Sequence, residues 1–242
     1  RDWSSDVCSS DLLCAWLVSV ALVAPAFAQA PEVPYGQTRL GISDTDRDGT
    51  LYVPKSYKPG TGMPLVMMLH GFSGGGDSQK RLFALAEELG FLVIAPESRD
   101  ITWGKEAPGF DDDVKYLGAA FRHVGGLVNI DFDRVALAGQ SDGAVYALSM
   151  GLAYGDTFNH VIILAGGGLI EPIRRKGMPK VFIAHGLKYT TFPIDLSGRK
   201  NVAQLKKEGY DVTYREHEGG HGTPAEVVRD AMVWFLDTSK HQ

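Results

Sequence analysis

The chain has 242 residues, of which 44% are hydrophobic and 22% are charged, which is enough apolar material to bury one sizeable core. Its 24 basic and 29 acidic residues give a formal net charge of −5, and no block of lysines or arginines stands out. This balance excludes nucleic acid and anionic membrane surfaces as expected partners.

The first 28 residues are expected to be absent from the mature protein. Residues 12–28 form an apolar run that ends in Ala-Phe-Ala, the pattern of a secretory signal peptide and its cleavage site. Residues 2–12 are acidic where such a peptide is basic, and one choice of codons for them spells a common sequencing-library adapter. We therefore expect residues 1–28 to be adapter-derived sequence plus signal peptide. Residues 29–242 would then form a single exported domain, secreted or periplasmic and without a membrane anchor.

Both cysteines, Cys8 and Cys14, lie in this leader, so the mature chain is expected to contain no thiol and no disulfide. Downstream, short apolar runs alternate with longer segments of helical periodicity. The expected strands are 64–70, 91–96, 134–139, 160–166, 180–186 and, nearer an edge, 211–216, and the expected helices are 78–89, 111–125, 141–154, 195–207 and 225–236. This alternation predicts an α/β domain with a mostly parallel sheet and helices on both faces. In such sheets, functional residues gather at the carboxyl ends of the strands.

The first expected strand is followed by the glycine-rich stretch HGFSGGG, residues 70–76. Such a turn can aim backbone N–H groups at a developing oxyanion, and we assign the oxyanion hole to the N–H groups of Phe72 and Asp142. His70 is expected to brace this loop rather than to act as a base. A phosphate-binding loop fits less well, because the Lys-Ser/Thr ending of a P-loop is absent.

The next expected strand, 91–96, is followed by the stretch ITWG, in which Trp103 is expected to border the substrate cleft. The alternative is that this tryptophan pins the loop. Three consecutive aspartates, residues 111–113, then precede a helix, where they are expected to cap it and complement its dipole. We therefore expect no metal and no other cofactor.

The third expected strand runs into Gly139-Gln140-Ser141-Asp142-Gly143, and a helix follows. A serine in the G-x-S-x-G pattern between a strand and a helix occupies a sharp turn that lifts its Oγ above the sheet. Alone the pattern is weak, since a serine that caps a helix would look similar. The strand before it and the helix after it indicate a nucleophile, and Gln140 is expected to contact the substrate.

The last expected strand and the last expected helix are joined by EGGHG, residues 218–222. A histidine on this glycine loop can reach over the sheet toward Ser141, and His221 comes late in the chain, as the order serine, acid, histidine requires. His221 is therefore the expected general base.

Together these segments resemble the α/β-hydrolase family, and within it the secreted lidless esterases of the polyhydroxybutyrate depolymerase and feruloyl esterase type. The resemblance spans residues 50–236 and rests on LHGFSGGG, VALAGQSDGAVYAL, VFIAHG followed by FPID, and YREHEGGH. It implies an α/β-hydrolase fold without a large lid domain, because only a short loop, 167–179, lies where lidded lipases insert a cap. It also implies a serine hydrolase that cleaves carboxylic esters, including bulky or polymeric ones, through an acyl-enzyme on Ser141.

In such relatives the triad acid follows the strand that ends in His-Gly, at a position occupied here by Tyr189. A phenol is uncharged at neutral pH and stabilises an imidazolium far less than a carboxylate does. Asp195 is the first candidate to replace the acid, although an aspartate there also suits the start of a helix. Glu171 is the second candidate, and a triad without an acid is the third interpretation.

Two other functions stay open at this stage. Without an acid, the chain could be a catalytically impaired, hydrolase-like binding protein. The same fold could also serve a peptidase or thioesterase, because fold alone does not fix the leaving group.

Overall fold

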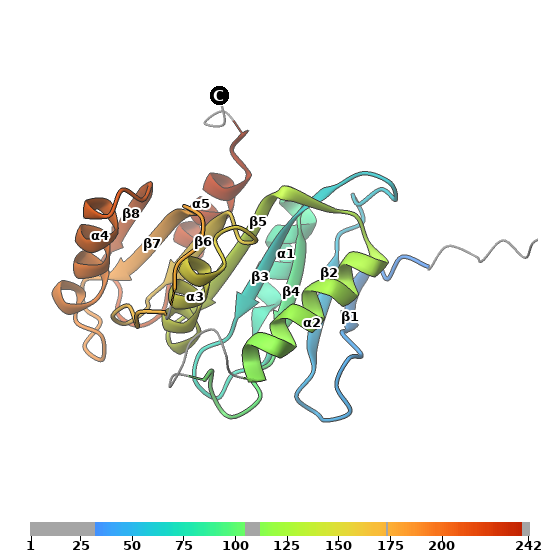
Figure 1. The fold of residues 1–242 in the computed structure, drawn as a ribbon, viewed down its shortest axis with the longest axis horizontal. Helices are drawn as coiled ribbons and strands as arrows, with labels where there is room; N and C mark the ends of the chain where they lie inside the picture. The colour runs from blue at the N-terminus through green and yellow to red at the C-terminus, as the bar shows by residue number, and fades with distance from the viewer. Residues whose placement is uncertain (1–31, 105–111, 173, 239–242) are drawn as a thin grey trace, which may run out of the picture. The chain divides into compact units, whose positions relative to one another are not determined.

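An eight-stranded sheet organises the residues that the structure, a computed structural model, describes: 32–104, 112–172 and 174–238 (Figure 1). These residues lie within one unit, Glu32–Gln242. The expected leader, its two cysteines and Asp111 lie outside the described residues.

The strands follow the order β1-β2-β4-β3-β5-β6-β7-β8 across the sheet. Their bounds are β1 (Gly36–Arg39), β2 (Gly49–Val53), β3 (Met63–Leu69), β4 (Leu92–Pro96), β5 (Ile130–Gln140), β6 (His160–Leu164), β7 (Lys180–Gly186) and β8 (Val212–His217). β1 pairs with β2, and β2 with β4, in antiparallel register, whereas every pair from β4 to β8 is parallel. The mostly parallel sheet expected from the sequence is therefore confirmed.

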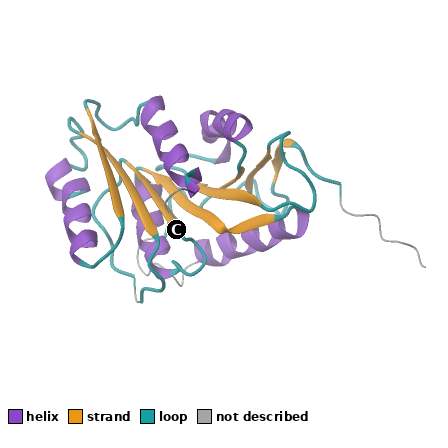
Figure 2. Cartoon of the chain, turned by 90° about the horizontal axis from the view of Figure 1, so that it is seen from above, coloured by secondary structure: helices purple, strands orange, loops and turns teal. Residues whose placement is uncertain are grey.

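Helices cover both faces of this sheet (Figure 2). Their bounds are α1 (Lys80–Leu89), α2 (Asp112–Leu127), α3 (Asp142–Ala153), α4 (Gly198–Lys207) and α5 (Ala225–Leu236), with short 3₁₀ helices η1 (Gly76–Gln79) and η2 (Ile194–Leu196). The buried side chains of α1 and α5 pack into one apolar cluster, and those of α2, α3 and α4 pack into another on the opposite face. The central strands are buried on both sides, which explains their continuous apolar runs in the sequence.

Several element bounds differ from the sequence-based expectation: β5, for example, begins at Ile130 rather than at Arg134. β1 and β2 were not expected, because their short, partly polar segments lack the apolar run of a central strand. The expected helix 195–207 begins only at Gly198, since Ser197 has non-helical backbone angles, and Asp195 lies in the preceding η2.

The chain changes direction across the sheet between β3 and β5, which are neighbours. From β3 it proceeds through α1 to β4 on one side, and α2 then carries it back to β5 on the other side. Parallel α/β sheets bind ligands at such switch points, outside the carboxyl ends of the strands. Here those ends are Leu69 and Gln140, directly before the two segments expected to hold the oxyanion hole and the nucleophile.

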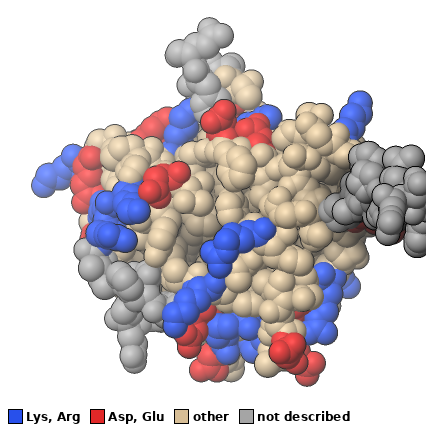
Figure 3. Space-filling model, turned by 45° about the vertical axis from the view of Figure 1, so that its right-hand side comes forward, with Lys and Arg blue, Asp and Glu red and all other residues tan. Residues whose placement is uncertain are grey.

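Two further features concern the surface. No helix among the described residues is long and apolar enough to cross a membrane. On the face that Figure 3 shows, basic and acidic side chains are interspersed around a largely uncharged surface.

Candidate active site

Ser141 occupies a strained turn between β5 and α3. Its backbone has φ 55° and ψ −116°, a left-handed φ that non-glycine residues rarely adopt. Its N–H donates to the carbonyl of Leu164, 2.9 Å away at the end of the neighbouring strand β6. The residue is buried, with 8% of its surface exposed. The fold therefore fixes this serine at the carboxyl end of the central strand β5, where a nucleophile of this kind is expected.

The turn depends on two glycines. A methyl group built on Gly139 would lie 2.2 Å from the carbonyl oxygen of Gly143, and one built on Gly143 would lie 2.3 Å from that of His70. Both distances are far shorter than a van der Waals contact, so neither glycine can be replaced unless the backbone moves. The glycines of G-x-S-x-G are thus required by close backbone contact between β3, β5 and α3.

The glycine-rich loop after β3 passes directly beside the serine. A methyl group on Gly71 would lie 3.4 Å from Ser141 Cβ, so the loop backbone is next to the place where a substrate carbonyl would bind. The Ser73 N–H donates to the carbonyl of Ile101 at 3.0 Å, which fixes the loop from outside. Among the described residues no acceptor is found for the Phe72 N–H. This arrangement suits the oxyanion role expected for Phe72.

His70 and the loop after β4 hold the glycine-rich loop in place. The His70 ring contacts the Gly71 carbonyl through Nδ1 at 2.7 Å and accepts the Ser98 N–H through Nε2 at 3.1 Å. These partners require the proton on Nδ1. Burial lowers the pKa of His70, which keeps the ring neutral. His70 is therefore a brace of the loop.

Trp103 does not border the cleft, and the expectation that it does is wrong. Its side chain is 1% exposed, and its indole N–H donates to the His70 carbonyl at 2.8 Å. The ring lies 4.8 Å from that of His70 and 5.7 Å from that of Tyr146, between centroids. A buried indole with a satisfied donor cannot contact a substrate, so Trp103 pins the loop instead.

Asp142 and Asp113 also shape this loop. The Asp142 carboxylate accepts a hydrogen bond from the Thr102 hydroxyl, which ties the loop to the serine turn. The buried carboxylate of Asp113 accepts the backbone N–H groups of Arg99 at 2.6 Å and Gly104 at 2.7 Å. The sequence predicted that Asp113 lies at the start of a helix, and α2 does begin there. Its hydrogen bonds to the backbone of the loop after β4 are seen only in the tertiary structure.

His221 lies on a loop that packs against the end of β7. The Leu187 N–H donates to the His217 carbonyl, and the Lys188 N–H donates to the Gly219 carbonyl, both at 2.9 Å. A methyl group on Gly186 would lie 2.3 Å from the Gly220 carbonyl oxygen. The histidine loop and the loop that should carry the acid are therefore held side by side.

Tyr189 occupies the place beside the expected base. Its ring stacks on that of His221, with centroids 4.8 Å apart and planes 18° apart. The tyrosine is buried and also contacts Phe192 and His185, each with ring centroids 5.6 Å away. An aromatic contact thus stands where the resemblance implies a carboxylate.

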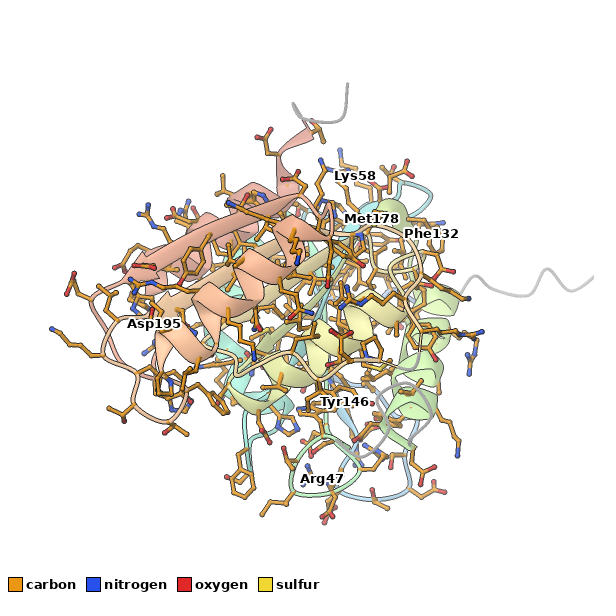
Figure 4. All side chains as sticks on the ribbon, turned by 60° about the vertical axis from the view of Figure 1, so that its left-hand side comes forward. Arg47, Lys58, Phe132, Tyr146, Met178 and Asp195 are labelled. Carbon is orange, nitrogen blue, oxygen red and sulfur yellow. The ribbon has the colours of Figure 1, made fainter. Side chains whose placement is uncertain are left out.

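Neither candidate acid contacts His221 among the described residues. The Asp195 side chain is 74% exposed and pairs with Arg199 at 2.9 Å. Arg199 in turn pairs with Glu216 at 2.8 Å. Figure 4 shows Asp195 well to the side of Tyr146, which follows Ser141 by about one turn of α3. Asp195 is therefore a surface ion-pair residue in this structure.

The Glu171 carboxylate also bonds to residues other than His221. Its two carboxylate oxygens accept hydrogen bonds from Arg175 at 2.7 and 2.8 Å, and Gln204 of α4 donates to one of them. The part of the chain that the structure describes contains no hydrogen bond from the His221 ring to Ser141 Oγ or to a carboxylate. The Ser141 turn and the glycine-rich loop beside it thus have the geometry expected of a nucleophile and an oxyanion hole, whereas the expected base, His221, has no orienting carboxylate among the described residues.

Gln140, the residue before Ser141, is half-buried and lines a cleft of about 810 Å³ between α1 and α5. In the described ranges, no cluster of three or more histidine, cysteine, aspartate or glutamate side chains is arranged to hold a metal ion.

No family model matches the chain. Several solved structures share its fold. The fluorophosphonate-binding serine hydrolase FphF of Staphylococcus aureus aligns with a TM-score of 0.66 and 16% identity over 79% of this chain and 92% of its own. The S-formylglutathione hydrolase FrmB of the same organism aligns with a TM-score of 0.65 and 16% identity over 78% of this chain and 92% of its own. Esterase 2 of Thermogutta terrifontis aligns with a TM-score of 0.61 and 18% identity over 79% of this chain and 87% of its own. These likenesses establish the α/β-hydrolase fold, and no separate lid domain is evident in the described residues.

Proposed function

We propose that this chain of α/β-hydrolase fold is a serine hydrolase that cleaves carboxylic esters through an acyl-enzyme on Ser141. The observation that carries the proposal is the Ser141 turn, held at φ 55° with the Gly71 backbone beside it. A strained serine next to an oxyanion loop has no evident role in packing and a clear role in acyl transfer. The similar solved structures include one titled a serine hydrolase and one titled an esterase, which supports the assignment.

The reaction proceeds in two halves. Ser141 Oγ attacks the ester carbonyl carbon while its proton passes to the His221 ring, and the Phe72 and Asp142 N–H groups stabilise the oxyanion. The alcohol departs with the proton from His221, leaving an acyl group on Ser141. Water then attacks this acyl group, gives its proton to His221 and releases the acid as Oγ regains a proton.

The His221 ring, stacked on Tyr189, makes no hydrogen bond with Ser141 Oγ among the described residues, so the two side chains must approach each other during the reaction. No carboxylate among the described residues is hydrogen-bonded to the ring either, so we expect slow turnover rather than none. In the serine protease template, loss of the acid costs about 10⁴-fold, and the remaining groups still give roughly 10³ to 10⁴ over water.

We also propose that the enzyme acts on bulky or polymeric esters outside the cytoplasm. Four large apolar side chains are exposed on loops after the carboxyl ends of the strands: Phe72 at 62%, Ile101 at 50%, Leu187 at 39% and Leu196 at 70%. Apolar side chains around an unlidded site suit contact with a large hydrophobic substrate. Export rests on the signal-like leader alone.

Fluorophosphonate labelling combined with ester turnover tests the assignment. We expect the native protein to be labelled once and Ser141→Ala to lose both the label and the burst of p-nitrophenol from p-nitrophenyl acetate. Ser56→Ala is the control, since Ser56 is exposed in the loop before β3, at the opposite edge of the sheet from Ser141. Unchanged labelling and turnover in Ser141→Ala would rule out the proposed nucleophile.

A second candidate is a binding protein that has lost catalysis. The stacking of His221 on Tyr189, without a carboxylate, favours it. Such a protein would show neither a burst nor Ser141-dependent labelling.

A further inference from the structure

A cleft of about 810 Å³ runs between α1 and α5, on the face of the sheet opposite to α3. The α1 residues that line it include Arg81, Ala84, Leu85 and Glu88, which share one side of the helix by their spacing. From α5 the lining includes Ala225, Val228 and Met232. The two helices thus form the walls.

We take as the mouth of the cleft the end whose lining adjoins the candidate active site along the chain. Gln140, which lines it, immediately precedes the nucleophile, and Gly222, which also lines it, immediately follows the expected base. Both α1 and α5 begin at the carboxyl edge of the sheet and run back along its face. A group that enters beside Ser141 can therefore continue between the helices.

The floor is apolar. It is formed by Met68 of β3 and Leu164 of β6, with Leu82 of α1 and Met232 of α5 beside them, and each of these four side chains is at most 4% exposed. Hydrocarbon above this floor would meet the partly exposed Leu85 and Val228 of the two walls, and its removal from water contributes about 0.8 kcal/mol per buried methylene.

The far end of the cleft is tied by an ion pair. Arg229 of α5 donates to both carboxylate oxygens of Glu88, at 2.6 and 2.8 Å. Glu88 lies seven residues after Arg81, or about 10 Å along α1. The length between the mouth and this pair therefore suits an extended chain of moderate length.

Two basic residues stand at the mouth. Lys80 and Arg81, at the start of α1, are exposed and line the cleft, and no acidic side chain that the structure describes pairs with either of them. They complement the carboxylate that ester hydrolysis releases next to Ser141. This charge, together with the apolar floor, matches a fatty carboxylate with its head at the mouth and its chain inside.

We infer that this cleft is the acyl-chain site, and that the enzyme prefers esters of unbranched aliphatic acids of moderate length. The inference rests on the proposed function, because the acyl group must be carried by Ser141. It assigns the acyl side of the ester to the space between α1 and α5 and leaves the alcohol to the open loops at the carboxyl edge.

The kinetic test compares p-nitrophenyl octanoate with p-nitrophenyl acetate. In the native protein, kcat/KM is expected to favour octanoate. Ala84→Phe places a ring on the α1 wall and is expected to lower the octanoate-to-acetate ratio by about tenfold or more. The matched control is Ala203→Phe, since Ala203 is an exposed alanine of α4 on the other face of the sheet, and it should leave the ratio unchanged.

A binding test requires no turnover. Calorimetry with octanoate should show binding to the native protein that weakens several-fold in Ala84→Phe and in Arg81→Gln, but not in Lys207→Gln on α4. An unaltered ratio and equal octanoate binding in Ala84→Phe would overturn the acyl-chain site while Ser141-dependent hydrolysis still stood. Hydrolysis that survives Ser141→Ala would instead overturn the proposed function, with the octanoate result unaffected.

Discussion

Ser141 and His221, the proposed nucleophile and base, differ in how firmly their surroundings fix them. The serine is fixed by its strained backbone and by its N–H bond to Leu164. The histidine is exposed and is positioned chiefly by its stack on Tyr189. The sequence singled out both residues as candidates from their motifs, and the resemblance marked Tyr189 as a departure. It did not indicate that this tyrosine packs face to face against the base, because residues on separate loops meet only in the folded chain.

We expect Tyr189→Asp to raise kcat for p-nitrophenyl acetate by about 100-fold or more, toward the roughly 10⁴-fold that the acid contributes in the serine protease template. The new carboxylate would stand beside the ring that must become charged. Steady-state turnover measured from pH 5 to pH 9 checks this.

Tyr189→Asn is the matched control, because it has the shape of the aspartate variant without the charge, and no gain is expected from it. Asp195→Asn should leave turnover unchanged, since that carboxylate pairs with Arg199 on the surface. A large loss in Asp195→Asn would instead restore Asp195 as the functional acid.

The elements around the site are joined by backbone contacts that leave no space for side chains. β3, β5 and α3 meet at Gly139 and Gly143, where an added methyl group would collide with a carbonyl oxygen. The apolar runs predicted the central strands, because strands buried on both faces are apolar throughout. β1 and β2 were not predicted, because strands at the edge of a sheet carry a mixed pattern of polar and apolar residues. The start of α4 at Gly198 was not predicted either, because it depends on backbone angles at Ser197 that composition does not reveal.

Gly139→Ala is expected to lower the free energy of unfolding by about 3 kcal/mol, because the added carbon would lie 2.2 Å from the Gly143 carbonyl oxygen and β5 would have to move away from α3. Urea unfolding followed by circular dichroism measures this change.

The control is Gly126→Ala in α2, where no atom lies within 4 Å of the added carbon. Alanine forms helix more readily than glycine, so this variant should be unchanged or up to about 1 kcal/mol more stable. Equal effects of the two substitutions would show that the elbow tolerates a side chain.

At the scale of the whole molecule, one buried carboxylate connects the antiparallel edge of the sheet to a helix. Asp48, 1% exposed, accepts the N–H groups of Gly41, Ile42 and Ser43, an Arg39 side-chain bond at 3.0 Å and the Tyr116 hydroxyl of α2. Burial by itself would raise the pKa of Asp48, but the hydrogen bonds from Gly41 and Ile42, followed by those of Tyr116 and Arg39, lower it. The ionised form is thus the one that stabilises the fold.

Asp48→Asn should lower the free energy of unfolding at pH 7 by about 3 kcal/mol, since several buried donors lose a charged acceptor. Because the folded pKa is depressed, this contribution is complete above the unfolded pKa and is lost as the pH falls through the folded value. The difference between native and variant proteins, measured by urea unfolding at a series of pH values, should therefore shrink in acid.

Asp46→Asn is the control, because Asp46 is exposed two residues earlier, and it should change stability by less than about 0.5 kcal/mol at any pH. A difference for Asp48→Asn that persists unchanged at low pH would contradict the role given to its charge.

The sequence by itself predicted the fold class, which the structure confirms, and it singled out Ser141, the loop 70–76 and His221 as candidate site residues. Each of these predictions depends on local patterns: apolar runs, glycine turns and their order along the chain. The tertiary structure decided the rest. Trp103 is buried, Asp195 faces Arg199, Tyr189 stacks on His221, and a cleft opens between α1 and α5. Contacts between segments far apart in the chain depend on how helices pack and loops meet. Those distances are fixed only when the whole core is assembled.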